Sequence, residues 1–160
     1  MELSRLKLEQ YNLTGFSLDP IDGAEPVALG AYANPSDANF GSNTNFQTVQ
    51  LENGEQRFTV ELNLHAEPRE GGTFPYRFKI ALVGLFDGHD LPEERREPLV
   101  CVNGASMLYG VAREMLLGIS HRFIHGPIML PTVHFGSIGK DMENKSAVAK
   151  SEKGPSIPSS

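Results

Sequence analysis

Apolar and polar residues alternate along the middle of this chain in a pattern typical of β-strands. Between Phe58 and Ala66 every second residue is apolar, and the residues between them are polar. A similar alternation starts at Tyr76, and beyond Ile80 both faces become apolar, up to Leu85. Because successive side chains of a strand point to opposite faces, these segments predict two strands with one buried face. The doubly apolar end of the second strand predicts a helix on one face and another subunit on the other.

Two further strands are predicted upstream. Residues 5–18 carry apolar side chains whose parity switches twice, which indicates a strand interrupted by bulges. Residues 46–51 form a second, shorter pattern, and the Asn53–Gly54 pair after it predicts a type I′ hairpin turn with positive φ at both residues. The Pro-, Gly- and Asn-rich residues 19–45 predict a long connection.

The stretch from residue 103 to residue 135 is the most apolar part of the chain. Apolar residues at three- and four-residue spacing predict a helix of about 15 to 18 residues that begins at Asn103 or Ser106 and ends near residues 120–123. Gly126 and Pro127 prevent its continuation, so the apolar residues 128–135 are predicted to be non-helical. One domain of this length has too few partners to bury both segments, which predicts a subunit or another polypeptide that covers them.

Charge and cysteine content narrow the classes of partner. Lys and Arg total 14 against 20 Asp and Glu, a net charge of −6, which disfavours nucleic acid and anionic lipid as partners. The single cysteine, Cys101, excludes an intrachain disulfide and fits a reducing compartment. The first ten residues lack the apolar core of a secretory signal, and no apolar run approaches the roughly 18 residues of a membrane span. We therefore expect a cytoplasmic protein without membrane insertion.

The titratable residues do not form a recognisable catalytic or metal site. His121 and His125 have the four-residue spacing of a helical zinc pair, but no Glu or Cys stands at a companion spacing. His65 and His134 are predicted to be structural, and Cys101 to be a buried thiol. Because the common nucleotide, hydrolase and zinc-protease motifs are missing from the sequence, we predict no enzyme activity, no cofactor and no metal.

Two local patterns carry a resemblance to a known family. LYGVARE at residues 108–114 and MLPTVHF at residues 129–135, together with the order of strands, crossover and helix, resemble the SecB-like protein-export chaperone family. The resemblance implies an α+β fold in which a four-stranded antiparallel sheet packs with one long helix. A second, amphipathic helix normally follows in the family, but residues 136–160 have hardly any apolar stripe, so we predict that the second helix is short or absent here. The residues from Gly139 onward are polar, mixed in charge and without periodicity, so we predict a SecB-like chaperone domain over residues 1–138 and a flexible polar tail over residues 139–160.

The resemblance also implies an activity and an assembly. Members of the SecB-like family are ATP-independent holdases that bind unfolded polypeptides in hydrophobic grooves. For this chain the resemblance implies the same activity and a homotetramer built from two dimers. The predicted partners are non-native polypeptides or an antitoxin, with a SecA-type translocation motor as a further partner in export. Thr14 and Lys79 stand where export chaperones carry an acidic patch, so a chaperone dedicated to one antitoxin of a toxin–antitoxin module is the alternative. From another class, a structural or scaffold oligomer would bury the same apolar residues.

Apolar residues of the predicted strands, of the long helix and of the segment after it give two sets of candidate site residues. The predicted client-binding residues are Phe74, Tyr76, Phe78, Met129, Leu130, Val133 and Phe135. The predicted oligomer interface consists of Val83, Leu85, Met115, Leu116 and Ile119.

Overall fold

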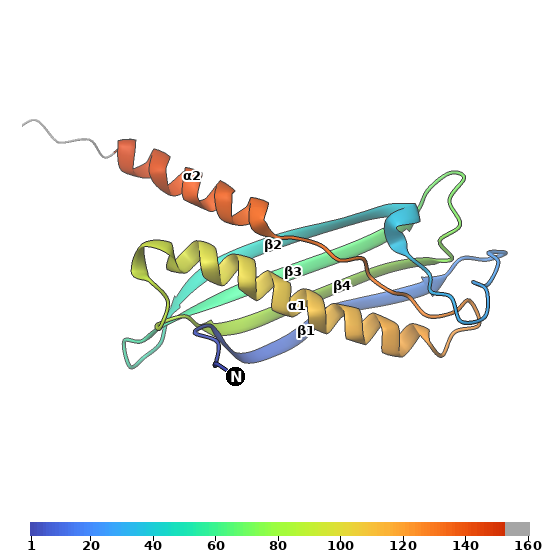
Figure 1. The fold of residues 1–160 in the computed structure, drawn as a ribbon, viewed down its shortest axis with the longest axis horizontal. Helices are drawn as coiled ribbons and strands as arrows, with labels where there is room; N and C mark the ends of the chain where they lie inside the picture. The colour runs from blue at the N-terminus through green and yellow to red at the C-terminus, as the bar shows by residue number, and fades with distance from the viewer. Residues whose placement is uncertain (153–160) are drawn as a thin grey trace, which may run out of the picture.

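The strands of the chain form one antiparallel sheet, with helices on one of its faces (Figure 1). A computed structural model describes residues 1–152, and its sheet has the strand order β1-β4-β3-β2. This confirms the predicted fold class of a four-stranded antiparallel sheet with one long helix and a shorter second one. In chain order the elements are β1 (Lys7–Pro20), η1 (Pro35–Asp37), β2 (Ala38–Gln50), β3 (Gln56–Pro68), β4 (Tyr76–Asp87), η2 (Glu93–Arg95), α1 (Arg96–Ser120) and α2 (Gly136–Glu152).

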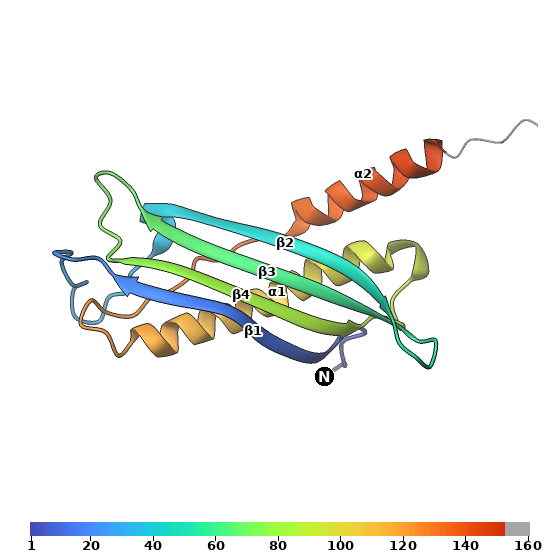
Figure 2. The ribbon, with the colours of Figure 1, turned by 180° about the vertical axis from the view of Figure 1, so that it is seen from behind.

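The two central strands, β3 and β4, have one buried face and one open face, as their alternation predicts. Phe58, Leu62 and Leu64 of β3 and Phe78 and Leu82 of β4 are at most 2% exposed and lie under α1. Burial of these side chains against the helix is the main source of stability of the fold. Viewed from behind, no helix of the described chain covers the opposite face (Figure 2).

Strand β1 contains the bulges that its switching parity predicts. Its register against β4 shifts between Leu8 and Gln10 and again between Leu13 and Gly15. Each extra residue returns the next apolar side chain to the helix side of the sheet, because a one-residue shift reverses the face of every residue after it. Tyr11 and Leu13 nevertheless remain 48% and 44% exposed, since α1 does not cover this edge.

Strand β2 begins at Ala38, so the predicted connection over residues 19–45 is wrong for its last eight residues. Residues 38–45 are almost all polar or small, and they form a strand because they pair with β3, not because of an apolar pattern of their own.

The predicted type of the turn between β2 and β3 is also wrong. Gly54 has φ 84° but Asn53 does not have a positive φ, and a five-residue loop closes the hairpin through a Leu51 N–H bond of 2.8 Å to the Glu55 carbonyl.

Helix α1 has 25 residues and starts at Arg96, seven residues before the predicted start at Asn103. Pro98 lies in its first turn, where the missing backbone N–H has no helical partner in any case. Ser106 is not a cap, because its hydroxyl donates to the Val102 carbonyl inside the helix. The predicted end near residue 120 is confirmed, and Gly126 adopts φ 93° shortly after it.

The non-helical segment after α1 returns along the helix and is held by a buried hydroxyl. Ser120 is fully buried; its Oγ donates to the Leu116 carbonyl at 2.6 Å and accepts the Ile128 N–H at 2.7 Å. Ile128 and Leu130 are completely buried, and Ile128 forms a parallel bridge with Ala33. The predicted non-helical course of this segment is confirmed, and it closes one end of the core.

Helix α2 occupies part of the predicted tail. Residues 139–152 are helical, whereas the sequence pattern gave no helical stripe; the last eight residues of the predicted tail lie outside the described part. Gly139 is buried, and a Cβ there would lie 2.9 Å from Cγ2 of Val102, so glycine lets α2 approach α1. The division into a domain over residues 1–138 and a tail over residues 139–160 stays a prediction. Neither described helix has the length and apolarity of a membrane span.

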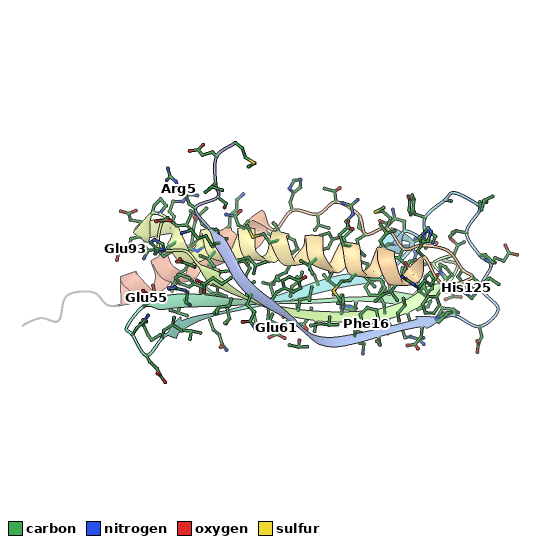
Figure 3. The ribbon with its side chains drawn as sticks, turned by 90° about the horizontal axis from the view of Figure 1, so that it is seen from below. Arg5, Phe16, Glu55, Glu61, Glu93 and His125 are labelled. Atoms are coloured by element: carbon green, nitrogen blue, oxygen red, sulfur yellow. The ribbon has the colours of Figure 1, made fainter. Side chains whose placement is uncertain are left out.

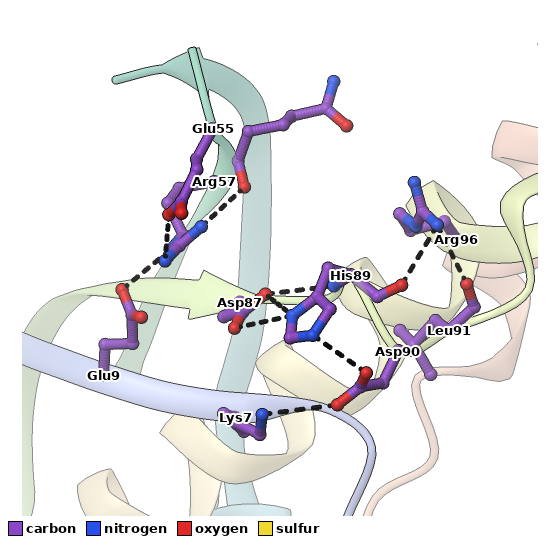
Figure 4. A network of polar contacts seen from close by, with 10 residues as sticks. Lys7, Glu9, Glu55, Arg57, Asp87, His89, Asp90, Leu91 and Arg96 are labelled. Carbon is purple, nitrogen blue, oxygen red and sulfur yellow. Dashed lines mark hydrogen bonds and ion pairs between the residues drawn. The ribbon is translucent and has the colours of Figure 1, made fainter. Parts of the chain in front are cut away.

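A polar cluster lies at the end of the sheet where β4 leads toward α1 (Figure 4). Asp87, the last residue of β4, is 6% exposed and accepts a bond of 3.0 Å from the His89 backbone N–H. The His89 ring places Nδ1 2.7 Å from Asp87 and Nε2 2.9 Å from Asp90. Burial alone would raise the pKa of the Asp87 carboxyl, but the hydrogen bonds and charge of His89 and the charge of Arg57 outweigh it, so this pKa lies below its ordinary 3.8.

We expect Asp87→Asn to lower the free energy of unfolding at pH 7 by about 1.5 to 3 kcal/mol, because hydrogen bonds to a charged group are lost. The pKa of Asp87 is lower in the folded than in the unfolded chain. Its contribution is therefore present above about pH 4 and is lost as the pH falls through the folded pKa. Urea unfolding should show that the difference between the two proteins shrinks steadily as the pH falls below about 4.

Asp90→Asn is the matched control for this prediction. Asp90 also faces His89, but its side chain is 45% exposed, so the substitution should change stability by less than about 1 kcal/mol. A loss of unfolding free energy in Asp87→Asn that does not shrink as the pH falls below about 4 would contradict the stabilising role of the Asp87 carboxylate.

Candidate functional site

A cleft runs beside the edge strand β2, on the helix side of the sheet. Its volume is about 660 Å³, and one wall is the edge of β2 while the others come from α1, α2 and the segment between them. The residues that line it are Phe40, Ser42, Asn43, Thr44, Asn45, Phe46, Cys101, Tyr109, Val133, His134, Phe135, Ser137, Ile138, Asp141, Met142 and Lys145.

The β2 side of the cleft has two hydroxyl side chains between two aromatic ones. Phe40, Ser42, Thr44 and Phe46 pair with helix-facing residues of β3, so they point to the helix side. The Phe46 ring stacks on Phe58, with centroids 5.7 Å apart. The Thr44 hydroxyl oxygen is buried and has no hydrogen-bond partner within residues 1–152, which leaves a donor and acceptor available to a bound group.

The α1 side of the cleft is neutral and rigid. The Tyr109 hydroxyl donates to the Pro131 carbonyl at 2.6 Å, and its ring packs at 5.8 Å against Phe135. Burial raises the pKa of Tyr109 to about 12, partly offset by the charge of Arg113, and burial also raises the pKa of the Cys101 thiol. Both groups stay protonated at neutral pH, and the prediction that Cys101 is a buried thiol is confirmed.

Helix α2 adds two apolar side chains, with charges at the rim. Ile138 and Met142, four residues apart and partly buried, line the cleft from this side. Asp141 and Lys145 are exposed, so the rim carries one charge of each sign. The arrangement offers apolar contact and hydroxyl hydrogen bonds, and it contains no charged pair suited to general acid–base chemistry.

Of the seven predicted client-binding residues, only Val133 and Phe135 line this cleft. Three of the others are at most 5% exposed: Phe74, Tyr76 and Phe78. The Phe74 ring packs against the other two rings, and the Phe78 ring lies 6.3 Å from that of Phe40. Leu130 is completely buried and Phe135 is 6% exposed. The core of the chain therefore contains Phe74, Tyr76, Phe78 and Leu130, which do not line the cleft, whereas Phe135 lines it with the little surface that it exposes. A client contact at these residues stays a prediction. Met129 is partly exposed, but its sulfur accepts from Arg113 Nε at 3.3 Å outside the cleft.

The five predicted interface residues lie on two opposite faces. Val83 and Leu85 are partly exposed on the open face of the sheet, where their neighbours Asn12 and Thr59 are polar. Met115 and Ile119 are partly exposed on α1. Leu116 is completely buried against the sheet, so in this chain it is a core residue rather than a surface one. An interface role for the other four stays a prediction.

In the described part of the chain, no group of three or more His, Cys, Asp or Glu side chains has an arrangement that could hold a metal ion. His121 is exposed just after α1. His125 lies at one end of the molecule (Figure 3), where its ring packs at 6.0 Å against Tyr76. His65 is exposed on the open face, beside Gly41. His134 is exposed at the cleft.

Sequence analysis missed most of the residues that form the cleft. Phe40 and Phe46 have the same parity within a polar stretch, a period-two signal that could have extended the predicted strand upstream. Ile138 and Met142 have the four-residue spacing of one helix face, a weak sign of α2. Tyr109 could not be identified, because nothing in the sequence shows which side of a buried helix faces a cleft.

Comparison with known proteins identifies the family. Residues 23–145 match the family model described as preprotein translocase subunit SecB. The chain belongs to the SecB family. The SecB family is a family of chaperones and not an enzyme class.

Curated relatives agree with this assignment. The protein-export protein SecB of Nitrobacter hamburgensis is 27% identical over 124 residues, which cover 77% of this chain and 76% of the relative. SecB of Bradyrhizobium diazoefficiens is 27% identical over 123 residues, covering 76% of this chain and 74% of the relative.

Two solved structures are more distant. The SecB-like chaperone Rv1957 of Mycobacterium tuberculosis, in complex with a ChAD peptide from the antitoxin HigA1, has a TM-score of 0.46 and 15% identity, covering 81% of this chain and 91% of that one. A Streptococcus agalactiae protein of unknown function also has a TM-score of 0.46, with 10% identity, covering 79% of this chain and 97% of that one.

Proposed function

We propose that this SecB-family chain is an ATP-independent holdase that binds non-native polypeptides in the cleft between β2, α1 and α2. The observation that carries the proposal is an open cleft of about 660 Å³ with aromatic and aliphatic walls and hydroxyl groups between them. Such a site offers contact area to many apolar side chains without demanding one shape.

The physical effect of such binding follows from mass action. A protein that binds unfolded chains lowers their free energy and their free concentration, which slows aggregation without any hydrolysis step. Met142 adds to this adaptability, because its unbranched side chain fits neighbours of different shape.

The proposed holdase assembles with itself, as a homotetramer of two dimers. Met107, Val111, Met115 and Ile119 of α1 are partly exposed apolar residues, and Tyr11 and Leu13 of β1 are exposed on the same side of the sheet. Burial of these side chains between copies would stabilise an oligomer. Several weak clefts on one assembly would also raise the avidity for a long client.

We expect Val133→Glu to weaken client binding at least about tenfold, because a carboxylate inside the apolar cleft loses hydration without gaining a partner. Val133 is partly exposed and lines the cleft, so the chain should still fold. The measurement is suppression of light scattering from heat-unfolded citrate synthase at stoichiometric ratios.

Val49→Glu is the matched control. Val49 is partly exposed on β2 but pairs with Arg57 on the open face, away from the cleft. It should suppress aggregation as the wild type does. Equal effects of the two substitutions would place client binding elsewhere, and a wild type that fails to suppress aggregation would refute the holdase.

A chaperone dedicated to one antitoxin is the second candidate function, and the open face of the sheet favours it over general export. Lys79 is exposed in the middle of this face, with no ion pair within residues 1–152, and Thr14 donates to the Ala81 carbonyl. An acidic patch for a translocation motor is missing at these positions. Purification from the native cell distinguishes the two: recovery of one antitoxin supports the dedicated role, and recovery of the motor with precursors supports export.

A further inference from the structure

One wall of the cleft is held by very few polar contacts. Residues 133–135 form this wall, between the end of α1 and the start of α2, and they belong to no helix or strand. Among the described residues, one hydrogen bond reaches the backbone of residues 130–134, and its donor is the Tyr109 hydroxyl. The Pro131 carbonyl accepts this bond at 2.6 Å. The position of the wall therefore depends on a single hydrogen bond from α1 and on the packing of its own side chains.

The backbone of this segment twists at the residue that accepts the bond. Ile128 and Leu130 are completely buried, so the even-numbered side chains point into the core before Pro131. After it the odd-numbered side chains point inward: Phe135 is buried and Val133 is partly buried, while the residues on either side of Val133 are exposed. Because successive side chains of an extended chain point to opposite sides, this change of parity requires a twist. The twist directs Val133 and Phe135 into the cleft.

Tyr109 is held firmly and contacts the wall on both sides of Val133. Leu108, its neighbour on α1, is completely buried against β4, so the helix backbone is fixed at this point. The Tyr109 ring meets the Phe135 ring edge to face at 5.8 Å, and the Tyr109 hydroxyl reaches Pro131. One side chain therefore fixes the wall two residues before and two residues after Val133.

We infer that the Tyr109 hydroxyl is a positioning group for the cleft: through Pro131 it holds Val133 and Phe135 in the arrangement that receives a client. This inference rests on the proposed holdase function and concerns how that site is kept ready for binding. A wall that is already in place need not be ordered when a client arrives, and such preorganisation raises affinity. Where the binding form is only partly populated, the apparent affinity falls in proportion to that population.

A positioning role has a kinetic signature that a direct contact lacks. If the hydroxyl only positions the wall, its loss lowers the fraction of molecules that are ready to bind. Clients then associate more slowly, and a bound client dissociates at an unchanged rate. If the hydroxyl instead contacts the client, its loss mainly speeds dissociation. The two rate constants therefore distinguish the two roles.

Tyr109→Phe in the full chain tests the inference, because it removes the hydroxyl and keeps the ring. The probe is reduced, carboxymethylated α-lactalbumin, a permanently unfolded protein, and stopped-flow fluorescence measures both rate constants. Loss of one hydrogen bond changes an equilibrium by roughly twofold to tenfold, so we expect association to slow about fivefold while dissociation changes by less than about twofold. Association that slows by less than about twofold would overturn the inference. Dissociation that speeds by more than about twofold would overturn it as well.

Ser120→Ala is the matched control, because it removes the other hydroxyl that holds this segment. The Ser120 hydroxyl accepts the Ile128 N–H, but two backbone hydrogen bonds with Ala33, of 2.8 and 2.9 Å, hold the same end of the segment. We expect Ser120→Ala to lower the stability of the chain and to keep the association rate within about twofold of the wild type. Equal slowing in the two variants would show that a general loss of stability slows association, and it would overturn the role of Tyr109.

The wild type separates this inference from the function on which it rests. If the wild type binds the probe and Tyr109→Phe binds it at the same rate, only the positioning role fails. If the wild type does not bind the probe and does not suppress citrate synthase aggregation, the holdase fails and the positioning role fails with it.

Discussion

Leu116→Ala should lower the free energy of unfolding by about 3 to 5 kcal/mol. The Leu116 side chain is completely buried between α1 and the sheet, so its truncation leaves a cavity that rigid neighbours cannot fill. The sequence pattern places this residue in a subunit interface, whereas its burial in the single chain makes it part of the core. Urea unfolding at low protein concentration measures the loss.

The adjacent residue gives a control with the opposite expectation. Met115 is partly exposed, so Met115→Ala should reduce the stability of the single chain by no more than about 1 kcal/mol. If Met115 lies between copies, its loss instead shifts the mass measured by light scattering toward smaller species. A Leu116→Ala variant that changes assembly mass without changing unfolding would show that the interface prediction was right.

Phe78→Ala should also destabilise the chain by about 3 to 5 kcal/mol, and this is the second large effect. Its ring is completely buried and lies 6.2 Å from Phe74 and 6.3 Å from Phe40. The sequence pattern predicts a client contact at this position, but the structure places the ring under the helix. Thermal and urea unfolding are the measurements, at equal protein concentration for both proteins.

A volume-conserving substitution separates the core role from a binding role. Phe78→Leu should lower stability by less than about 1.5 kcal/mol and leave aggregation suppression unchanged. If the folded Phe78→Leu variant lost aggregation suppression as strongly as Val133→Glu, Phe78 would contact clients as predicted, and a role in the core alone would not explain this residue.

The strands that carry a strong alternation could be predicted from sequence, because burial on one face imposes a period of two. This holds for β3 and β4, and the bulges of β1 follow from the same rule, since only an inserted residue keeps its apolar side chains on one face. The end of α1 could be predicted as well, because Gly126 and Pro127 exclude further helix.

The elements that were predicted wrongly depend largely on contacts with other elements of the fold. The first half of β2 is polar, and its pairing with β3 rather than its own composition makes it a strand. The start of α1 was predicted seven residues too late, because the apolar spacing is clear only after Asn103, whereas the helix accepts Pro98 in its first turn. Helix α2 depends on its contact with α1 at Gly139, a long-range feature that no local pattern reports.

The candidate site was harder to predict than the fold, for one physical reason. An excess of apolar residues indicates that surface must be covered but not which residues the chain covers itself. Leu130 belongs to the same apolar segment as Met129 and Val133, yet Leu130 is fully buried and the other two are not. Which side chains face the cleft depends on how α1 and the segment after it are oriented relative to the sheet.

The pairing of β1 with β4 has a consequence for how the chain is made. Pro20 pairs with Tyr76 and Lys7 with Asp87, so the first strand to leave the ribosome waits for the last strand of the sheet. At about 5 to 20 residues per second, this delay is roughly 3 to 16 seconds. During that time Leu8, Phe16 and Leu18 have no partner strand, and the nascent chaperone is itself an aggregation-prone polypeptide of the kind it is proposed to protect.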